Sequence, residues 1–347
     1  MRGVMASVAS RVDRAIGPLR APAYRDWQAA MADALTDPGE LCGLLGLPPE
    51  TAAAARAPAD TFPLLVPRPY LARVRPGDPN DPLLLQILPR QDELQEAPGF
   101  ARDPVGERTA IEGCHWLRKY SNRLLMVANG SCGVHCRFCF RRHLALQSPR
   151  PRGWSAPVLR HLAAGPRIRE VILSGGDPLA LGDAELGHLA RQLADIPHLT
   201  RLRVHTRLPI VVPQRVDDAL LAWLRGTRLA TWLVVHVNHP AEIDAAVAAA
   251  LGRLVDAGVP VLSQSVLLRG VNDRADVLAE LWERLADLRV IPYYLHQLDR
   301  VAGAAHFEVP VSRGRRLIRD VRARLSGFAV PRYVREVPGR PNKVVLA

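Results

Sequence analysis

The chain has 347 residues, of which 48% are hydrophobic and 23% are charged, a balance that is typical of globular proteins and excludes disorder throughout. Its five cysteines are too few for a small secreted domain held together by disulfides. The net charge of +12 suggests nucleic acid as a partner, but aromatic residues make up only 5% of the chain and do not interleave with basic runs, which argues against nucleic-acid binding. Charged residues interrupt segment 1–20, and no window approaches the roughly 18 apolar residues of a membrane span, so we expect a soluble, cytoplasmic protein.

The first 115 residues are rich in Pro and Ala and show no catalytic constellation. The pattern predicts a helix over 21–35. It also predicts a short helix within segment 41–50, which ends at Pro48. Six prolines then restrict 66–90 to short helical turns and loops. We therefore expect residues 1–115 to form a mainly helical, Pro-rich extension that covers one side of the remaining chain.

From 116 to 347, six short apolar runs alternate with segments of helical spacing, which predicts βα units around a parallel sheet. A complete eightfold barrel needs two more units, so the six form either an open doubly wound sheet or an incomplete barrel. In both architectures ligands bind beyond the carboxyl ends of the strands, where polar residues follow four of the runs. Strands are expected at 123–128, 170–174, 201–206, 231–237, 260–267 and 290–296, and helices at 183–195, 214–225, 241–257, 274–287 and 312–325.

Three of the five cysteines, Cys132, Cys136 and Cys139, follow the first expected strand in a C-x3-C-x2-C pattern. Glycine, histidine and arginine residues surround them, which argues against buried core thiols. A structural zinc site needs four ligands; His135 and His143 could supplement the thiolates, but there is no second cysteine pair. An iron–sulfur cluster on three thiolates accounts better for the pattern, and it leaves one iron open for a substrate or cofactor.

This motif resembles that of the radical S-adenosylmethionine (SAM) enzymes, whose usual core is an incomplete six-unit barrel. The resemblance implies an α/β fold with an incomplete (β/α)6 TIM-like barrel, and a 4Fe–4S cluster whose open iron is chelated by SAM. It also implies that Ser174, Gly175, Gly176 and Asp177 meet the SAM amino group, although such a turn is by itself a weak motif.

A narrower resemblance spans about residues 100–347. The chain is similar to the lysine 2,3-aminomutase family, which combines SAM, a 4Fe–4S cluster and pyridoxal 5′-phosphate (PLP). The strings that carry this resemblance are RKYSNRLLM, CRFCFRRH, RLPIVVPQR, NHPAEI, QSVLLRGVND, RVIPYYLHQLD, AAHFEVPVS and PGRPNK. VHCRFCFRRH, YLHQLDRVAGAAHF and the early stop after the last lysine resemble the branch that serves β-lysylation of elongation factor P (EF-P).

The family resemblance implies a reaction that moves the α-amino group of L-lysine to C3. In this branch a separate ligase attaches the β-lysine to EF-P, and the electron comes from a donor of the flavodoxin or ferredoxin type. A catabolic lysine or glutamate aminomutase is the nearest alternative. A basic iron–sulfur protein that binds nucleic acid would also explain the cysteines and the charge, but not Lys343 in the tail or the glycine-rich turn.

Only two lysines, Lys119 and Lys343, could bind PLP covalently. Lys119 lies just before the first strand, where a solvated or snorkelling lysine is expected. The resemblance assigns PLP to Lys343, in a Gly/Pro loop four residues from the end. It further implies that Arg141 holds the PLP phosphate and that Arg123 faces the substrate α-carboxylate, roles that suit a guanidinium.

Two carboxylates, Asp299 and Glu336, are implied to bind the substrate ε-ammonium, because a buried charge must be paired. Together they favour lysine over glutamate as the substrate. His236 and Gln264 match positions near SAM, although a histidine at a strand end is more often a structural hydrogen-bonding group. Arg207, after the third strand, is a candidate for the SAM or the PLP side.

The chain departs from the family pattern in two places. It has Arg274 after GVND and no tail cysteine, whereas the catabolic enzymes bind a structural zinc there. It has Glu336 where the family usually has Asp. Cys42 and Cys114 match no motif, and we expect them to be buried free thiols.

Overall fold

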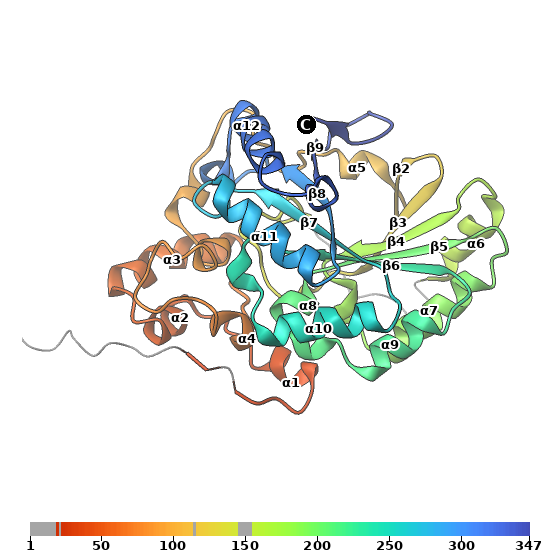
Figure 1. Ribbon diagram of the computed structural model, residues 1–347, viewed down its shortest axis with the longest axis horizontal. Helices are drawn as coiled ribbons and strands as arrows, with labels where there is room; N and C mark the ends of the chain where they lie inside the picture. The colour runs from red at the N-terminus through yellow and green to blue at the C-terminus, as the bar shows by residue number, and fades with distance from the viewer. Residues whose placement is uncertain (1–18, 21, 114–115, 145–154) are drawn as a thin grey trace, which may run out of the picture.

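The computed structural model describes residues 19–20, 22–113, 116–144 and 155–347 (Figure 1). Segment 1–18 and Cys114 lie outside the described residues, whereas Cys42 is a buried free thiol, as expected. No helix in these ranges combines the length and the apolarity that a bilayer crossing requires.

The N-terminal part is helical, and prolines lie in the first turn of the helices that begin at Pro38, Pro49 and Arg68. The helix expected over 21–35 is shorter in the structure, where α1 spans Trp27–Ala32. Asp26 caps this helix by accepting a hydrogen bond from the backbone N–H of Ala29 at 2.7 Å. The expectation of a helix over 41–50 is wrong, because one helix ends at Leu44 and another starts at Pro49, where a missing N–H costs nothing. The elements are α1 (Trp27–Ala32), α2 (Pro38–Leu44), α3 (Pro49–Thr61), α4 (Arg68–Leu71), η1 (Leu84–Gln86), η2 (Gln91–Leu94) and α5 (Glu107–Ala110).

All six expected strands are present, and they belong to a ten-stranded sheet whose strands follow one another in chain order. A doubly wound sheet reverses its strand order part-way, whereas this order never reverses, so the fold is an incomplete barrel. Strands β3 to β9 are parallel, and β1, β2 and β10 pair antiparallel at the two edges. The strands are β1 (Ile111–Gly113), β2 (Trp116–Tyr120), β3 (Arg123–Asn129), β4 (Glu170–Gly175), β5 (Arg201–Thr206), β6 (Ala230–His236), β7 (Val261–Leu267), β8 (Ile291–Gln297), β9 (Arg332–Arg335) and β10 (Val344–Val345).

Amphipathic helices connect the parallel strands and cover the outside of the sheet (Figure 1). Two begin later than expected, at Asp218 and Ala245, because prolines first form short 3₁₀ turns and Asp217 and Asp244 then cap the helices. The helical elements are α6 (Ala156–Ala164), α7 (Asp183–Ala194), α8 (Leu208–Val211), α9 (Asp218–Arg225), α10 (Ala245–Asp256), α11 (Ala275–Asp287) and α12 (Val311–Arg322), with 3₁₀ turns η3 (Pro178–Ala180), η4 (Pro213–Arg215), η5 (Pro240–Glu242), η6 (Ala305–Phe307) and η7 (Gly327–Ala329).

The N-terminal helices pack directly on the barrel. α1 to α4 lie together on one side of it in Figure 1. One hydrophobic core runs from Trp27 and Tyr70 in these helices to Leu173 and Val235 in the sheet. We propose the division at residue 115 as a compositional one, since β1 from the first part pairs with β2 from the second.

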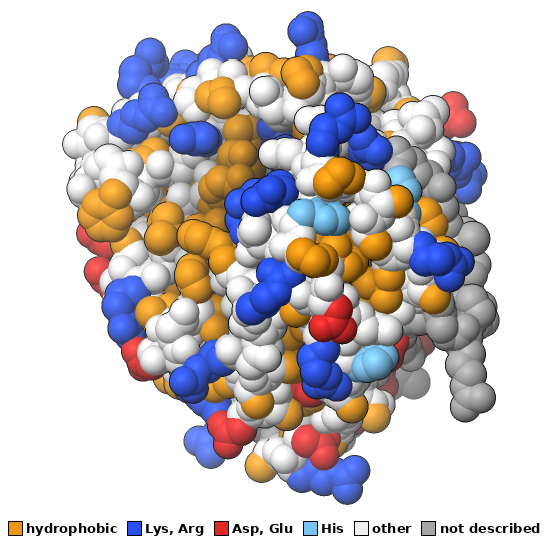
Figure 2. Space-filling view, turned by 90° about the vertical axis from the view of Figure 1, so that its right-hand side faces the viewer, with side chains coloured by type: hydrophobic (Ala, Val, Ile, Leu, Met, Phe, Trp, Pro, Cys, Tyr) orange, Lys and Arg blue, Asp and Glu red, His pale blue; other side chains and the backbone are white. Residues whose placement is uncertain are grey.

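On one face of the molecule the basic side chains are dispersed (Figure 2). On the face shown in Figure 2, Lys and Arg side chains lie among acidic and apolar ones, and apolar side chains line a hollow in the upper part of the view.

Candidate functional site

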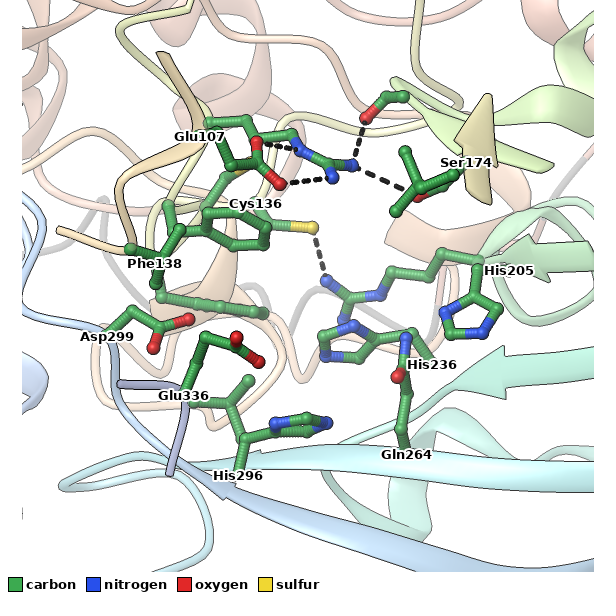
Figure 3. A pocket seen from close by; sticks show the side chains of 18 of the residues that line it. Glu107, Cys136, Phe138, Ser174, His205, His236, Gln264, His296, Asp299 and Glu336 are labelled. Atoms are coloured by element: carbon green, nitrogen blue, oxygen red, sulfur yellow. Dashed lines mark hydrogen bonds and ion pairs between the residues drawn. The ribbon is translucent and has the colours of Figure 1, made fainter. Parts of the chain in front are cut away.

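A single cavity of ≈ 1230 Å³ collects every site residue that the sequence predicts. Its wall is built from the ends of the barrel strands, the cysteine loop and the tail of the chain (Figure 3). Arg207 lines it as well. The predicted residues in the wall are Arg123, Cys132, Cys136, Cys139, Arg141, Ser174, Gly175, Gly176, Asp177, His236, Gln264, Asp299, Glu336 and Lys343.

The three cysteines of the motif share one part of this wall, on the loop after β3. Burial raises the pKa of the Cys139 thiol to about 11 and that of Cys132 well above its usual value. Within the described ranges, no three His, Cys, Asp or Glu side chains converge on a site for a single metal ion. Three thiol ligands spread along one loop suit a multi-iron cluster, which offers a separate iron to each sulfur.

A buried ion cluster holds the cysteine loop against the N-terminal part. Glu93 of η2 accepts from Arg137 Nε at 2.8 Å and Nη2 at 2.6 Å, and from Arg142 Nη2 at 2.5 Å. The three side chains are 1%, 0% and 2% exposed. The Phe62 ring lies 4.7 Å from each guanidinium carbon. An acid from the extension therefore fixes two arginines of the CRFCFRR segment.

The glycine-rich segment after β4 closes against the same loop. Gly176 donates its backbone N–H to the carbonyl of Asn129 at 2.6 Å, and Asp177 donates to that of Ser131 at 2.7 Å. A Cβ on Gly176 would lie 2.2 Å from the Ser131 carbonyl oxygen, so a side chain there requires the backbone to move. Gly175 has φ +126°, which an L side chain rarely adopts.

The carboxylate of Asp177 is engaged by the protein itself. Its oxygens accept from Thr206 Oγ1 and the backbone N–H of Arg207, both at 2.7 Å, and from the backbone of Leu179 and Leu208 at 3.0 and 3.1 Å. Burial raises the pKa of Asp177, and these donors act against that shift. Asp177 thus joins the ends of β4 and β5 and shapes the rim of the cavity.

The tail of the chain brings an amine and an acid into the cavity, where a second acid follows β8. Lys343 Nζ forms an ion pair with Glu336, whose oxygens also accept from the Tyr120 hydroxyl at 3.2 Å. Burial raises the pKa of Asp299 to about 7, an effect that Lys343 opposes and the Glu336 carboxylate strengthens. Figure 3 shows Asp299 and Glu336 on one side of the cavity, with His205, His236 and Gln264 on the other.

The two predicted anion-binding arginines have different surroundings. Arg141 donates to both oxygens of Glu107 at 2.7 Å, and to Ser174 Oγ and the Gly175 carbonyl at 3.0 and 3.1 Å. Although burial disfavours its charge, the Glu107 pair raises the pKa of Arg141. Arg123 lies 3.8 Å from the centre of the Tyr120 ring and has no acidic partner among the described residues.

Two further expectations concern Lys119 and His236. Lys119 is half-buried and not fully solvated: it lines the cavity and donates to the Val105 carbonyl at 3.1 Å, and burial lowers its pKa. β2 turns this side chain inward, so both lysines of the chain reach the cavity. Burial lowers the pKa of His236 to about 3, with the nearby Arg207 cation adding to the shift, so the imidazole is neutral and shares a hydrogen bond of 3.2 Å with Asn238.

Comparison with known proteins identifies the family. No family model matches the chain. It is 45% identical over 332 residues to the L-lysine 2,3-aminomutase of Escherichia coli K12, covering 94% of this chain and 96% of that protein. It is 42% identical over 325 residues to the L-lysine 2,3-aminomutase of Haemophilus influenzae, covering 93% and 96%. The chain belongs to the L-lysine 2,3-aminomutase family. The family that the sequence motifs indicate is therefore confirmed.

A more distant relative agrees with this membership. The L-lysine 2,3-aminomutase of Clostridium subterminale is 35% identical over 322 residues, covering 92% of this chain and 77% of that protein. Among solved structures, a radical SAM methyltransferase from Sphaerobacter thermophilus matches with a TM-score of 0.46 and 20% identity, covering 63% of this chain and 68% of that one.

Sequence reasoning missed the acids that hold the site of this aminomutase-family chain together. Glu93, Glu107 and Glu242 pair with arginines that the motifs contain or follow. Each pair joins residues at least 34 positions apart, so no local spacing could reveal it. The repeated arginines of CRFCFRR, which need buried counter-ions if they face inward, were the available signal.

Proposed function

We propose that this protein is an L-lysine 2,3-aminomutase, an isomerase that moves the α-amino group of L-lysine to C3 and so makes β-lysine. It uses the cofactors of its family, a 4Fe–4S cluster, SAM and PLP. The observation that carries the proposal is that Lys343, at the far end of the chain, lines the same cavity as the three motif cysteines. A covalent PLP site and a cluster site in one cavity suit this reaction, which needs both groups.

The residues present fit each of these groups. Cys132, Cys136 and Cys139 offer three thiolates to the cluster, and Lys343 offers its amine to PLP. We propose that the rim from Ser174 to Asp177, with His236 and Gln264 across the cavity, meets SAM. When bound, SAM and the cluster supply the radical that removes hydrogen from C3, and PLP supplies the π-system that permits nitrogen migration.

Two acids of the cavity suit the ε-ammonium of lysine. Asp299 and Glu336 influence each other electrostatically, and among the described residues the cation paired with Glu336 is the Lys343 amine. When Lys343 is engaged by PLP, the two carboxylates need another cation, because buried anions are costly without one. A substrate ammonium fills that need, whereas the side-chain carboxylate of glutamate would repel both acids.

The two arginines suit the anionic groups of cofactor and substrate. The family motifs assign the PLP phosphate to Arg141 and the substrate carboxylate to Arg123. Glu107 already neutralises Arg141, whereas Arg123 has no acidic partner in the described part of the chain, which favours Arg123 for the more highly charged phosphate. We therefore propose the reverse of the motif assignment: Arg123 binds the PLP phosphate and Arg141 binds the substrate carboxylate.

We further propose that the β-lysine serves the modification of EF-P, to which a separate ligase attaches it. This proposal rests on VHCRFCFRRH and YLHQLDRVAGAAHF, which resemble the EF-P branch of the family. An electron donor of the flavodoxin or ferredoxin type reduces the cluster. Because EF-P acts in translation, we propose that the protein works in the cytoplasm.

Borohydride trapping tests the PLP site. The protein is reconstituted anaerobically with iron and sulfide, loaded with PLP, reduced with borohydride and mapped by peptide mass spectrometry. We expect the pyridoxyl label on Lys343, no label in Lys343→Arg, and an unchanged Lys343 label in the matched control Lys119→Arg. A label on Lys119, which also lines the cavity, contradicts the assignment, and so does a missing label in a preparation with a complete cluster.

A further inference from the structure

The guanidinium of Arg207 lies between the cysteine loop and a buried acid. Arg207 follows β5 and is 6% exposed. Its Nη1 donates to the Cys136 sulfur at 2.7 Å, a contact drawn in Figure 3. Its Nη2 donates to Gln86 Oε1 at 2.7 Å and to Glu242 Oε2 at 2.9 Å. One edge of the cation therefore faces a cluster ligand, and the other faces its counter-ion.

The surroundings of Arg207 fix this orientation. Its backbone N–H donates to Asp177 at 2.7 Å, which anchors the start of the side chain to the glycine-rich segment. The rings of Tyr70 and Phe138 lie 5.7 and 5.6 Å from the guanidinium carbon. Turning the guanidinium away from Cys136 would break its buried hydrogen bonds, which is costly where no water can replace them.

Several hydrogen bonds also fix the position of Glu242, the counter-ion of Arg207. Glu242 is 0% exposed and accepts from the backbone of Asn238 at 2.9 Å and His239 at 3.1 Å, and from Gln86 Nε2 at 3.2 Å. Burial acts to raise its pKa, but Arg207 and these donors keep the pKa of Glu242 below its usual value. The pair thus forms a fixed dipole with its positive end at the sulfur.

Such a dipole changes the energy of an electron on the cluster. Reduction adds one negative charge that is shared with the thiolate sulfurs, and N–H donors and nearby cations stabilise it. We propose that Arg207 is a positioning residue that raises the reduction potential of the 4Fe–4S cluster through its hydrogen bond to Cys136, and that Glu242 limits this effect. One electron passes from the low-potential flavodoxin- or ferredoxin-type donor to the oxidised cluster, and no bond or proton at Arg207 changes. The inference rests on the proposed function only in requiring a cluster on the three cysteines.

The test is an EPR-monitored redox titration of the anaerobically reconstituted protein without SAM. In Arg207→Gln we expect the ratio of reduced to oxidised cluster at a fixed potential to fall about tenfold, which for a one-electron couple is a shift of about 59 mV to a more negative midpoint. Glu242→Gln keeps an acceptor for Arg207 but removes the opposing charge, so its midpoint should move to a more positive potential. Arg274→Gln, which removes an exposed arginine paired with Asp276, is the control for net charge and should match the wild type.

The opposite signs of the two expected midpoint shifts distinguish an electrostatic effect on the cluster from a structural defect. If Arg207 were only structural, both buried variants would shift in the same direction or not at all relative to the control, and either result overturns the inference. Should Arg207→Gln fail to hold iron, the sign in Glu242→Gln still decides. Iron and sulfide analysis of the wild type separates the two proposals, because a wild-type protein without a cluster refutes the proposed function itself.

Discussion

The buried acid Glu93 offers a sharp test of how the extension supports the cysteine loop. Glu93→Gln keeps the shape of the side chain but removes the negative charge that Arg137 and Arg142 share. Backbone carbonyls also accept from these arginines, with Arg137 Nη1 2.8 Å from the Phe62 oxygen and Arg142 Nη1 3.1 Å from that of Gly303. The variant therefore loses charge compensation more than hydrogen bonds.

The size of the stability loss in Glu93→Gln follows from the burial of the three side chains. With all three side chains no more than 2% exposed, removing the acid leaves two guanidinium charges in a medium that solvates them poorly. Breaking a buried ion pair by removing one partner costs about 3–5 kcal/mol of folding free energy. Because the glutamine carbonyl still accepts one hydrogen bond, we expect Glu93→Gln to cost about 3 kcal/mol, the lower end of that range.

Urea unfolding of the cofactor-free protein, followed by circular dichroism, measures this cost. The matched control is Glu280→Gln, which breaks the pair with Arg284 at 2.7 Å, where both side chains are about half exposed. Such a surface pair contributes only about 0.3–0.5 kcal/mol. If the two variants lost equal amounts of unfolding free energy, burial would not be the reason that the ion pairs of Glu93 stabilise the protein.

Further variants test other parts of the site. The pKa of Asp299 is about 7 in the folded protein, whereas its usual value is 3.8. Between these two pH values the folded state therefore binds more protons than the unfolded state. The free energy of unfolding of the wild type should thus fall as pH rises through this window. Asp299→Asn should thus gain stability relative to the cofactor-free wild type from pH 4 to pH 7 in urea titrations; a difference that is constant with pH contradicts the shift. Gly176→Ala should lose about 1–3 kcal/mol and most of its cluster loading, because the new Cβ meets the Ser131 carbonyl. Gly182→Ala, where no atom lies within 4 Å of the new Cβ, is its control and should change stability by less than about 0.5 kcal/mol; equal effects would show that the close approach at Gly176 is unimportant.

Six strands of the barrel could be predicted because each leaves a local signal. Parallel strands that are covered on both faces are continuous apolar runs, and all six runs became strands. β9 was missed, since RYVR is a short run in which arginines alternate with apolar residues. α3 was missed because Pro58 lies inside it, and proline is disfavoured in the interior of a helix.

The choice between two architectures needed long-range information. Alternating strands and helices are common to barrels and doubly wound sheets, and only the pairing order distinguishes them. The same limit applies to side chains. The cysteine spacing and the tail lysine are visible in the sequence, but the pairing of Arg207 with Cys136, 71 positions away, appears only in the folded chain.

The most direct test of the account is turnover of L-lysine by the anaerobically reconstituted protein, supplied with PLP, SAM and a chemical reductant. The products are resolved by chromatography and mass spectrometry after derivatisation. We predict that β-lysine accumulates with the wild type, that Lys343→Arg forms none, and that L-glutamate is left unchanged. A preparation with a complete cluster and a labelled Lys343 that forms no β-lysine, or one that isomerises glutamate instead, would contradict this prediction.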